Sequence, residues 1–561
     1  MCGIFCLIQE NDIEQDLLKV FKKFQQNIEN RGPDSSNCKV YTWGTHKICF
    51  AVSVLWLQGN NLTEQPLEDH SSAFIYNGDI FQGLENNLET GCGDSKLLFK
   101  LIKKCIPSDI KEMRKIQGPY AFVFHKRHAN QIYFGRDVYG RRSLLVGKSQ
   151  KNNSLILCSV ARRNTEFDFI EVPAIGVFCL DLVTKSIKVF PWSYESRDVE
   201  NRLKNLELFL NTKIHVEQQV EVINYPLEQE NETLALLKSL QYSNSLFEML
   251  LHDKMWLENV KHLGTLLQTA IQRRIETQPK FCKHCIVTKN YCVHATTGVL
   301  FSGGVDCAVL SLLCNELVEF RRPIDLINVS FDEANNFQSP DRLTGLETLE
   351  ELKKCCPNRI WNFVEVNVDK QVLNKERNMH IADLVYPLNT VLDDSLGCAL
   401  WFASRGISEN YTSPCRVLLV GMGADELFGG YTKHRVAFKR NSWQGLKKCL
   451  EEDWSNLPYR NLGRDDRVVS DHGRQLRTPY LDENVVQFVR NLMCWEKTFP
   501  SEALSQGKGE KILLRTLAYY LGLKNTAFFK KRALQFGSRI ANPKENAHEV
   551  SPRLIGVTPA K

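Results

Sequence analysis

The stretch GVLFSGGVDCAVLSLL, residues 298–313, joins a short apolar run to a glycine-rich turn and then to a sequence with helical periodicity. A turn of this kind between a strand and a helix leaves backbone N–H groups unpaired at the positive end of the helix dipole. The sequence therefore predicts a phosphate-binding loop at 302–306. No Gly-Lys-Ser/Thr follows, so the loop is not of the Walker type. An ordinary tight turn between strand and helix is the alternative interpretation.

A second glycine-rich loop, VGMGADELFGGY at 420–431, follows another apolar run. Each loop carries an acidic residue, Asp306 in the first and Asp425 in the second. A carboxylate at a phosphate site requires a cation between the two anions, and Mg²⁺ prefers such oxygen ligands. Asp306 is therefore a candidate Mg²⁺ ligand.

Outward from the first loop, short apolar runs alternate with helical segments over residues 254–540. The runs are 298–301, 324–331, 359–368 and 415–421. This alternation predicts an α/β domain, a parallel sheet with helices on both faces. Residues 1–195 instead carry short strand-like runs separated by Gly, Asn and Asp, which indicates a sheet-rich α+β domain. We expect residues 196–253 to form a charged linker and residues 541–561 a polar tail.

The composition excludes several classes of protein. The 561 residues include 71 Lys and Arg, 65 Asp and Glu, and 19 cysteines. A net charge of +6 over this length is too dilute to indicate nucleic acid or a membrane surface as a partner. No apolar run approaches the ~20 residues of a membrane-spanning helix, and the N-terminus lacks the basic segment of a signal peptide. Cysteines scattered through apolar stretches are typical of a reducing compartment, so we expect a cytoplasmic protein.

Cys2 directly follows the initiator methionine and precedes Gly3. Removal of Met1 would leave a thiol and a free α-amine on one residue. The α-amine titrates near pH ~8, so it can act as the general base for its own side chain. Gly3 would let a substrate approach the backbone closely. An incidental early cysteine is the alternative interpretation.

Further motifs follow Cys2 in the same half of the chain. They are Arg31-Gly32-Pro33-Asp34, Asn77-Gly78-Asp79-Ile80-Phe81, Gly93-Asp94-Ser95, Gly118-Pro119-Tyr120-Ala121-Phe122 and Gly135-Arg136-Asp137. Together they resemble the N-terminal nucleophile glutamine amidotransferase domain of the asparagine synthetase family. The resemblance implies that Cys2 attacks the glutamine carboxamide, with the Asn77 side chain and the Gly78 N–H as the oxyanion hole. It also implies that Asp94 holds the α-ammonium of glutamine, and Asp79 is a further candidate for substrate binding.

The second half carries more motifs of the same family. They are Arg464-Asp465-Asp466-Arg467, His472-Gly473, the segments 477–482 and 509–515, and the segment 531–538. With the two loops they resemble the family's ATP pyrophosphatase domain, which implies ATP and Mg²⁺ as cofactors and Asp425 as a further Mg²⁺ ligand beside Asp306. The resemblance implies nucleotide contacts from Phe301, Ser302, Gly303, Gly304, Asp306, Cys307, Ser330, Gly421, Met422 and Gly423.

The sequence departs from the family at both sites. The family usually has an arginine for the α-carboxylate of glutamine, and residues 51–56 carry none. Val420 and Met422 stand where the family has the Ser and Glu of Ser-Gly-Glu-Gly. That Ser helps to hold the substrate and that Glu handles protons, and neither Val nor Met can do so.

These observations leave several hypotheses. The first is an asparagine-synthetase-like amide ligase in which glutamine hydrolysed at Cys2 supplies ammonia, inside the protein, to an acyl-adenylate. If the acid is aspartate, the products are asparagine, AMP and pyrophosphate. The second is a non-catalytic nucleotide-binding or scaffold relative, motivated by the missing residues. The third is adenylation of another acceptor, either a different acid or a tRNA base, but no RNA-binding module is recognisable.

One cluster lies outside these motifs. Cys282, Cys285, Cys292 and His294 have the spacing C-x₂-C-x₆-C-x-H, which can hold zinc. The family does not require zinc there. Reduced loop cysteines are the alternative interpretation.

Overall fold

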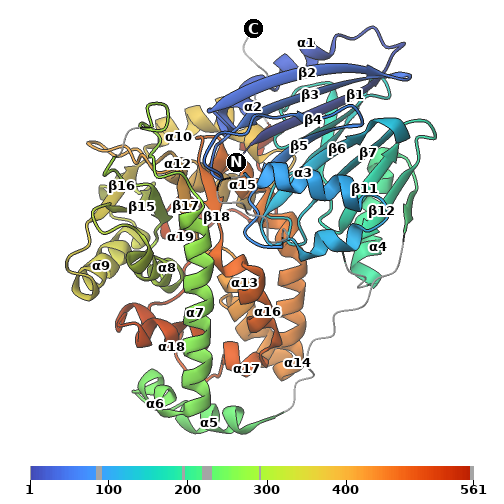
Figure 1. Cartoon of the computed structure of the whole chain (residues 1–561). Coiled ribbons are helices and arrows are strands. Elements are labelled where there is room, and N and C mark those ends of the chain that lie inside the picture. Colours follow the sequence, from blue (N-terminus) through green and yellow to red (C-terminus); the bar gives the residue numbers. More distant parts are fainter. Residues whose placement is uncertain are drawn as a thin grey trace.

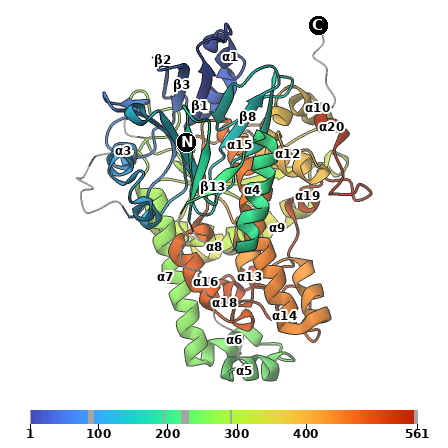
Figure 2. The same ribbon diagram turned by 90° about the vertical axis from the view of Figure 1, so that its right-hand side faces the viewer.

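The computed structural model describes residues 2–83, 91, 93–192, 196–217, 230–289 and 292–555. Residues 2–217 form an N-terminal domain of two sheets, and the chain from residue 230 forms a C-terminal domain beside it (Figures 1 and 2). The first sheet has the strand order β10-β8-β9-β1-β3-β2, and the second has the order β13-β12-β11-β7-β6-β5-β4. The strands are β1 (Gly3–Glu10), β2 (Ser35–Trp43), β3 (His46–Val54), β4 (Leu67–Glu68), β5 (Ser72–Gly78), β6 (Tyr120–Lys126), β7 (Gln131–Arg136), β8 (Leu145–Ser149), β9 (Leu155–Cys158), β10 (Phe167–Glu171), β11 (Gly176–Asp181), β12 (Ile187–Pro191) and β13 (Ile214–Val216).

The two sheets pack face to face, and β1 shows how the sequence specifies this. Ile4 and Cys6 are buried in the core that both sheets share. Phe5 and Leu7 point the other way, into the core beneath α1 (Leu17–Lys22) and α2 (Gln25–Arg31). Because both faces of β1 are covered, the strand is apolar along most of its length rather than alternating.

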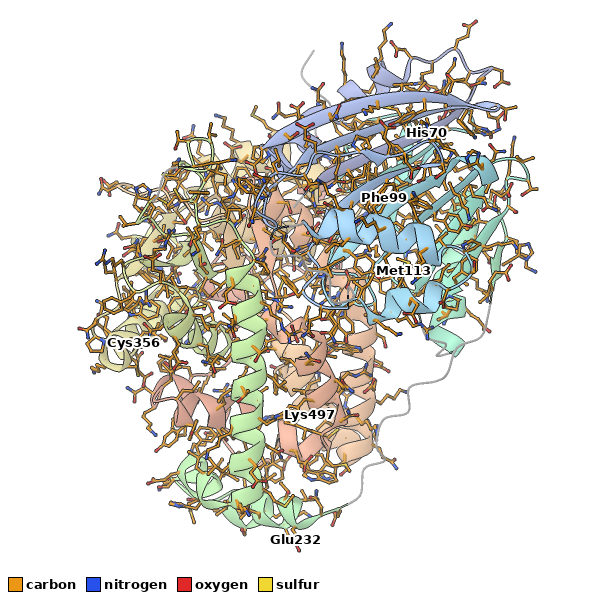
Figure 3. All side chains as sticks on the ribbon, in the orientation of Figure 1. His70, Phe99, Met113, Glu232, Cys356 and Lys497 are labelled. Carbon is orange, nitrogen blue, oxygen red and sulfur yellow. The ribbon has the colours of Figure 1, made fainter. Side chains whose placement is uncertain are left out.

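A helix also covers the outer face of the second sheet. On α3 (Asp94–Cys105), Phe99 stacks on Phe74 of β5, with the ring centroids 5.6 Å apart (Figure 3). The resulting order is helix, sheet, sheet, helix. The predicted sheet-rich α+β domain is confirmed.

The C-terminal domain is built on one parallel sheet with the order β16-β15-β14-β17-β18. Its strands are β14 (Thr297–Leu300), β15 (Ile324–Ser330), β16 (Trp361–Asn367), β17 (Val417–Leu419) and β18 (Gln475–Arg477). Three of the four predicted apolar runs contain one of these strands and the run 298–301 overlaps β14, so the α/β prediction is confirmed. β14 and β17 are neighbours from which the chain winds in opposite directions, and ligands bind at such a switch point in open α/β sheets.

Helices surround this sheet. α8 and α9 lie on one side of it and α12 on the other, as right-handed crossovers require (Figure 1). The helices of the C-terminal domain are α5 (Glu232–Leu240), α6 (Leu246–His252), α7 (Lys254–Glu276), α8 (Val305–Leu317), α9 (Pro340–Cys355), α10 (Lys370–Glu376), α11 (Ala382–Val385), α12 (Val391–Arg405), α13 (Ala424–Phe428), α14 (Thr432–Leu457), α15 (Gly463–Ser470), α16 (Glu483–Asn491), α17 (Cys494–Lys497), α18 (Ile512–Tyr520), α19 (Leu534–Gly537) and α20 (Pro552–Ile555). No helix in the described part of the chain is long and apolar enough to cross a membrane.

The segment expected as a linker is largely structured. α4 (Ser196–Leu210) buries Leu203 and Leu206 in the N-terminal core, and β13 pairs in parallel with β12. α5 and α6 pack instead on α17 and α18 of the C-terminal domain. The charged composition hid these helices because their buried residues occupy only one face.

The end of the chain, expected as a polar tail, is docked over its described part. The Val391 N–H donates to Glu549 O at 2.9 Å, and the Ser551 N–H donates to Asn389 O at 2.8 Å. Arg553 forms an ion pair with the buried Asp394 at 2.6 Å, and Leu554 is buried. Polar residues hold this segment through partners that are distant in sequence, which composition alone does not reveal.

Candidate active sites

The first candidate site lies where β1 begins beside the end of β5. Cys2 is 6% exposed, and its backbone N–H donates to Asn77 Oδ1 at 3.0 Å. The Asn77 Nδ2 is buried and has no hydrogen-bond partner among the described residues. Gln65 Nε2 lies 3.8 Å from the Cys2 Sγ. The predicted nucleophile and one predicted oxyanion donor are therefore adjacent, and the donor is free.

Two local features shape the reactivity of this site. Burial raises the pKa of the Cys2 thiol above its ordinary value. An added Cβ at Gly78 would lie 2.4 Å from Pro119 O, so only glycine allows β5 and β6 to approach this closely. The thiol thus needs a base, as the N-terminal nucleophile mechanism supposes.

Asp94 and Asp79, both predicted to bind substrate, lie in different surroundings. Asp94 starts α3 and accepts hydrogen bonds from the Tyr76 hydroxyl at 2.9 Å and the Ile80 N–H at 3.0 Å. Burial, together with the negative charge of Asp79, raises the pKa of Asp94 to about 7. Its carboxyl group is therefore an acceptor whose charge changes near neutrality.

Asp79 is bound into the domain interface. Its carboxylate pairs with Arg142 at 3.2 Å and with Arg477 at 3.0 Å, and it also accepts a hydrogen bond from Gln475. Although burial opposes ionisation, the two guanidinium groups hold the pKa of Asp79 below its usual range. Both oxygens are engaged by the protein, so the structure places Asp79 as a structural ion pair rather than as an open ammonium site.

The interface beside Cys2 is a network of buried ion pairs. Arg31 donates to Cys2 O at 3.3 Å and to Asp466 at 2.7 Å, and Arg142 joins Asp466 at 3.2 Å to Asp79. These groups connect the first site to α15, whose Arg464 and Asp465 line the second site. The two arginines beside Cys2 are thus already paired with carboxylates. Ala51, in the stretch where the family has its arginine, is fully buried in β3.

The second candidate site is a cavity of about 570 Å³ at the switch point between β14 and β17. It is lined by eight of the residues predicted for nucleotide or metal: Phe301, Ser302, Asp306, Cys307, Gly421, Met422, Gly423 and Asp425. An added Cβ at Gly421 would lie 2.8 Å from the Asp306 Cβ. Glycine there lets the two loops close on each other.

Three predicted residues do not line this cavity. Gly303 adopts φ +80°, and an added Cβ would lie 2.5 Å from the Gly345 N, so it packs the loop against α9. Gly304 lines a smaller adjoining cleft of about 40 Å³ together with Lys511 and Arg515. Ser330 is fully buried, and its hydroxyl accepts from the Asp332 N–H at 3.3 Å.

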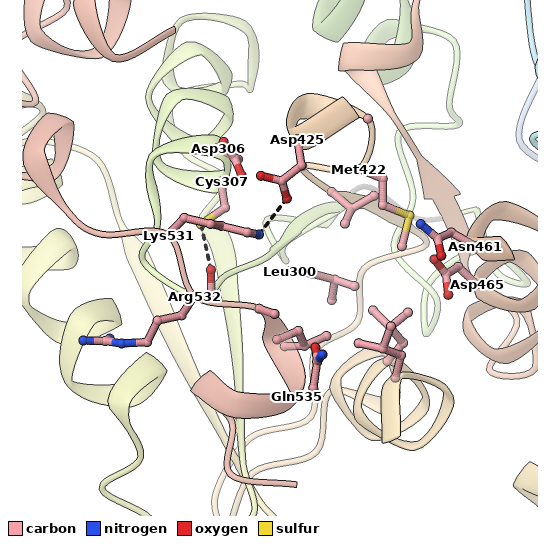
Figure 4. Close-up of a pocket in the computed structure, with 18 of the residues that line it drawn as sticks. Leu300, Asp306, Cys307, Met422, Asp425, Asn461, Asp465, Lys531, Arg532 and Gln535 are labelled. Atoms are coloured by element: carbon pink, nitrogen blue, oxygen red, sulfur yellow. Dashed lines mark hydrogen bonds and ion pairs between the residues drawn. The ribbon is translucent and has the colours of Figure 1, made fainter. Parts of the chain in front are cut away.

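The charged end of the cavity brings the two predicted Mg²⁺ ligands together. Lys511 Nζ lies 2.6 Å from both Asp306 Oδ2 and Asp425 Oδ1, and Lys531 lies 2.7 Å from Asp425 Oδ2 (Figure 4). Although burial opposes ionisation, the two lysines hold the pKa of Asp425 well below its usual range. Two partly buried carboxylates that converge on one cation are oxygen donors of the kind Mg²⁺ prefers, so they fit that ion.

Lys511 and Lys531 were not assigned roles from the sequence, although both lie in segments that match the family. The match of the segments 509–515 and 531–538 to the family was the only feature of the sequence that pointed to these two lysines. A lysine in a motif has no visible partner until the fold places it, so its role could not be read from spacing.

Away from the charged end, one wall of the cavity combines several apolar side chains with polar ones. Met422 extends toward Asn461 and Asp465 (Figure 4), and Arg464 pairs with Asp465 at 2.7 Å. The further apolar residues of this wall are Leu300, Leu392, Leu396, Leu400 and Val420. Glu426 lines the cavity and accepts from the Tyr431 hydroxyl at 2.7 Å, and burial followed by the charge of Asp425 raises its pKa to about 7.

Outside both sites, the structure also assembles the predicted zinc residues. The ligand atoms of Cys282, Cys285, Cys292 and His294 all lie within 4.8 Å of one another.

Comparison with known proteins identifies the families of the two domains. Residues 1–166 match the glutamine amidotransferase domain family, and residues 292–455 match the asparagine synthase family. The chain is 35% identical to the asparagine synthetase domain-containing protein CG17486 of Drosophila melanogaster, over 99% of this chain and 100% of that protein. It is also 35% identical to asparagine synthetase domain-containing protein 1 of Homo sapiens, over 96% of this chain and 95% of that protein. It is 23% identical to the glutamine-hydrolysing asparagine synthetase of Cricetulus griseus, over 92% of this chain and 80% of that protein. The chain therefore belongs to the asparagine synthetase domain-containing family, with an N-terminal nucleophile amidotransferase domain followed by an α/β asparagine synthase domain.

Proposed function

We propose that this protein is an ATP-dependent amide ligase that takes its nitrogen from glutamine. The Cys2 thiolate attacks the carboxamide carbon, ammonia leaves as the C–N bond breaks, and water hydrolyses the thioester to glutamate. At the second site the acceptor carboxylate attacks the α-phosphorus of ATP and displaces pyrophosphate. Ammonia then attacks the acyl carbon and displaces AMP, which leaves the amide. Aspartate is the acceptor that the family suggests.

The observation that carries this proposal is the convergence of Asp306, Asp425, Lys511 and Lys531 at the switch point. Two lysines and two carboxylates on glycine-rich loops are suited to a polyphosphate and its cation. Mg²⁺, held by Asp306 and Asp425, would neutralise the charge that accumulates on the phosphates. Lys511 and Lys531 would bind phosphate oxygens directly.

The free Asn77 Nδ2 supports the glutamine half of the proposal. A buried amide donor without a partner is costly unless it has a function. Beside a nucleophile it can stabilise the oxyanion of a tetrahedral intermediate, a contribution of about 3 kcal/mol per donor. The Asn77 Oδ1 at the same time accepts from the Cys2 nitrogen, so one side chain orients both groups.

The test measures release of AMP and pyrophosphate from the purified protein with ATP, Mg²⁺ and aspartate. Parallel reactions contain glutamine, ammonium or no nitrogen source. Asparagine formed in equal amount to AMP supports the proposal. ATP binding without AMP release, with any acid and either nitrogen source, contradicts it and favours a nucleotide-binding relative without turnover.

A second candidate function is amidation of an acid other than aspartate. Val420 and Met422 are among the apolar side chains of the cavity wall, where the family has a serine and a glutamate. Apolar side chains there favour a larger, less polar acid, because burying an aspartate side chain against them leaves its charge unpaired. AMP release from a panel of carboxylic acids, with aspartate as the reference, distinguishes the two.

A further inference from the structure

A zinc-binding knuckle lies between α7 and β14, outside both candidate sites. We propose that Cys282, Cys285, Cys292 and His294 bind one structural Zn²⁺ ion, with His294 coordinating through Nδ1. All four ligand atoms lie within 4.8 Å of one another. They include three sulfurs and one imidazole nitrogen, the soft donor set of closed zinc sites.

The measured separations match a tetrahedral site. The Sγ atoms of Cys282 and Cys285 lie 3.5 Å and 3.7 Å from the His294 Nδ1. Zinc bonds of about 2.3 Å to sulfur and about 2.0 Å to nitrogen, at tetrahedral angles, place S and N about 3.6 Å apart. The three thiols are free rather than joined in disulfides. One ion at the centre of this cluster can therefore reach all four ligands with little movement.

The backbone around the ligands is arranged as a zinc knuckle requires. The N–H groups of Cys285 and Ile286 both donate to Cys282 O at 3.1 Å, which folds the C-x₂-C segment into a tight turn. The backbone N–H groups of Cys282 and His294 hydrogen-bond to the Cys292 sulfur. Such bonds orient a metal ligand and are typical of the outer shell of a zinc site. Because the protein supplies all four ligands, the site is closed and its role is structural.

The knuckle is bound to its own domain and also contacts the other. The Lys283 N–H donates to Pro414 O at 2.8 Å, and Lys283 Nζ donates to His472 O at 2.9 Å. Lys289 Nζ lies 5.2 Å from the centre of the Trp56 ring, across the domain interface. The residue before Trp56, Leu55, hydrogen-bonds through its backbone to the Cys2 thiol. Zinc binding would therefore rigidify a segment that borders the glutamine site.

The lysines on this segment can balance the charge of the zinc site. Three thiolates and one Zn²⁺ carry a net charge of −1. Lys283, between two of the ligands, and Lys289, just after them, supply nearby positive charge on the same segment. Loss of the metal would leave this segment beside the interface held only by its hydrogen bonds and by the contact of Lys289 with Trp56.

The experiment measures zinc in the full-length protein, purified without an affinity tag from zinc-supplemented cells, by elemental analysis. One zinc per chain is expected. His294→Ala and Cys285→Ser, which alter the two ligands that are not fully buried, should lose the bound zinc, while His294→Cys should retain it. Cys356→Ser, at the partly exposed cysteine that follows α9 (Figure 3), is the matched control and should keep one zinc per chain.

Co²⁺ substitution gives a second readout that does not depend on activity. Tetrahedral Co²⁺ with thiolate ligands has intense visible and near-ultraviolet absorption, which should appear in the parent protein and in His294→Cys but not in His294→Ala. The absence of zinc from the parent protein, together with no Co²⁺ spectrum on titration, would overturn the proposal. A folded His294→Ala variant, judged by circular dichroism, that keeps a full complement of zinc would do the same.

Discussion

The two candidate sites are assembled in different ways. At the first, Cys2 directly precedes β1 and Asn77 lies near the end of β5 in the other sheet, and the Cys2 N–H donates to the Asn77 Oδ1 at 3.0 Å. At the second, Asp306 and Lys511 come from loops 205 residues apart and are held by their opposite charges. Substitution of a reactive group at the first site should therefore lower activity without lowering the stability of the fold. At the second site, a substitution should lower both.

The largest expected effect is at the nucleophile. Cys2→Ala should lower glutamine-dependent AMP formation by at least about 10³-fold, because no other group replaces the thiol. Ammonia-dependent AMP formation and the thermal unfolding midpoint should stay unchanged. Steady-state assays with each nitrogen source check this, and Cys38→Ala, at an exposed cysteine, is the control. Equal loss with both nitrogen sources would mean that the two sites do not act separately.

The second site should respond in both activity and stability. Lys511→Met removes the cation between Asp306 and Asp425, and should lower AMP formation by about 10²- to 10³-fold with either nitrogen source. It leaves the partly buried Asp306 without its ion-pair partner and Asp425 with Lys531 alone, so the unfolding free energy should fall by about 3 kcal/mol. Urea unfolding and AMP release measure the two effects. Lys544→Met, on the surface, should change neither.

If Lys511→Met lost activity but kept its full stability, the two sites would not differ in the way proposed. It would mean that Lys511 contributes to catalysis alone.

A smaller effect is expected at the interface. Arg142→Ala leaves Asp79 and Asp466 each without one buried partner, and should lower the unfolding free energy by about 3 kcal/mol. Because Asp79 directly follows Gly78, glutamine-dependent turnover should fall about tenfold more than ammonia-dependent turnover. Arg162→Ala, whose side chain is 53% exposed, should change stability by less than about 0.5 kcal/mol. A uniform loss with both nitrogen sources would show that the network only joins the domains.

The smallest expected effect is a pH dependence at Asp94. Its pKa in the folded protein is about 7, above the ordinary value, so the folded state holds this proton more tightly than the unfolded chain does. The contribution of Asp94 to stability is present below about pH 4 and is lost as the pH rises through about 7. Asp94→Asn should therefore gain stability relative to the parent between about pH 5 and pH 8 in urea unfolding.

The ionisation of Asp94 should also affect glutamine binding. If Asp94 must be ionised to hold the α-ammonium, KM for glutamine should fall by up to about tenfold per unit as the pH rises toward 7. Ammonia-dependent turnover should lack this dependence. A pH-independent KM would remove Asp94 from substrate binding.

Much of the fold could be predicted because it is encoded in short windows of sequence. The run 324–331 contains β15, and the run 298–301 covers all of β14 except its first residue. In each, a buried strand is apolar and glycine-rich turns bound it. β18 was missed because three residues are too short to show a period. α4 and β13 were missed because their charged faces dominate the composition.

For the two sites, too, some features follow from local sequence and others only from the tertiary structure. The sequence by itself determined that Cys2 precedes a strand, that two glycine-rich loops follow parallel strands, and that Asp306 and Asp425 belong to those loops. These features can be read from the sequence because the preferences that form strands, helices and turns depend on only a few consecutive residues. The tertiary structure decided that Asp79 pairs with Arg477, 398 residues away, and that Lys511 joins the two aspartates. Those partners depend on which of many buried charges meet after folding, and no local preference specifies that choice.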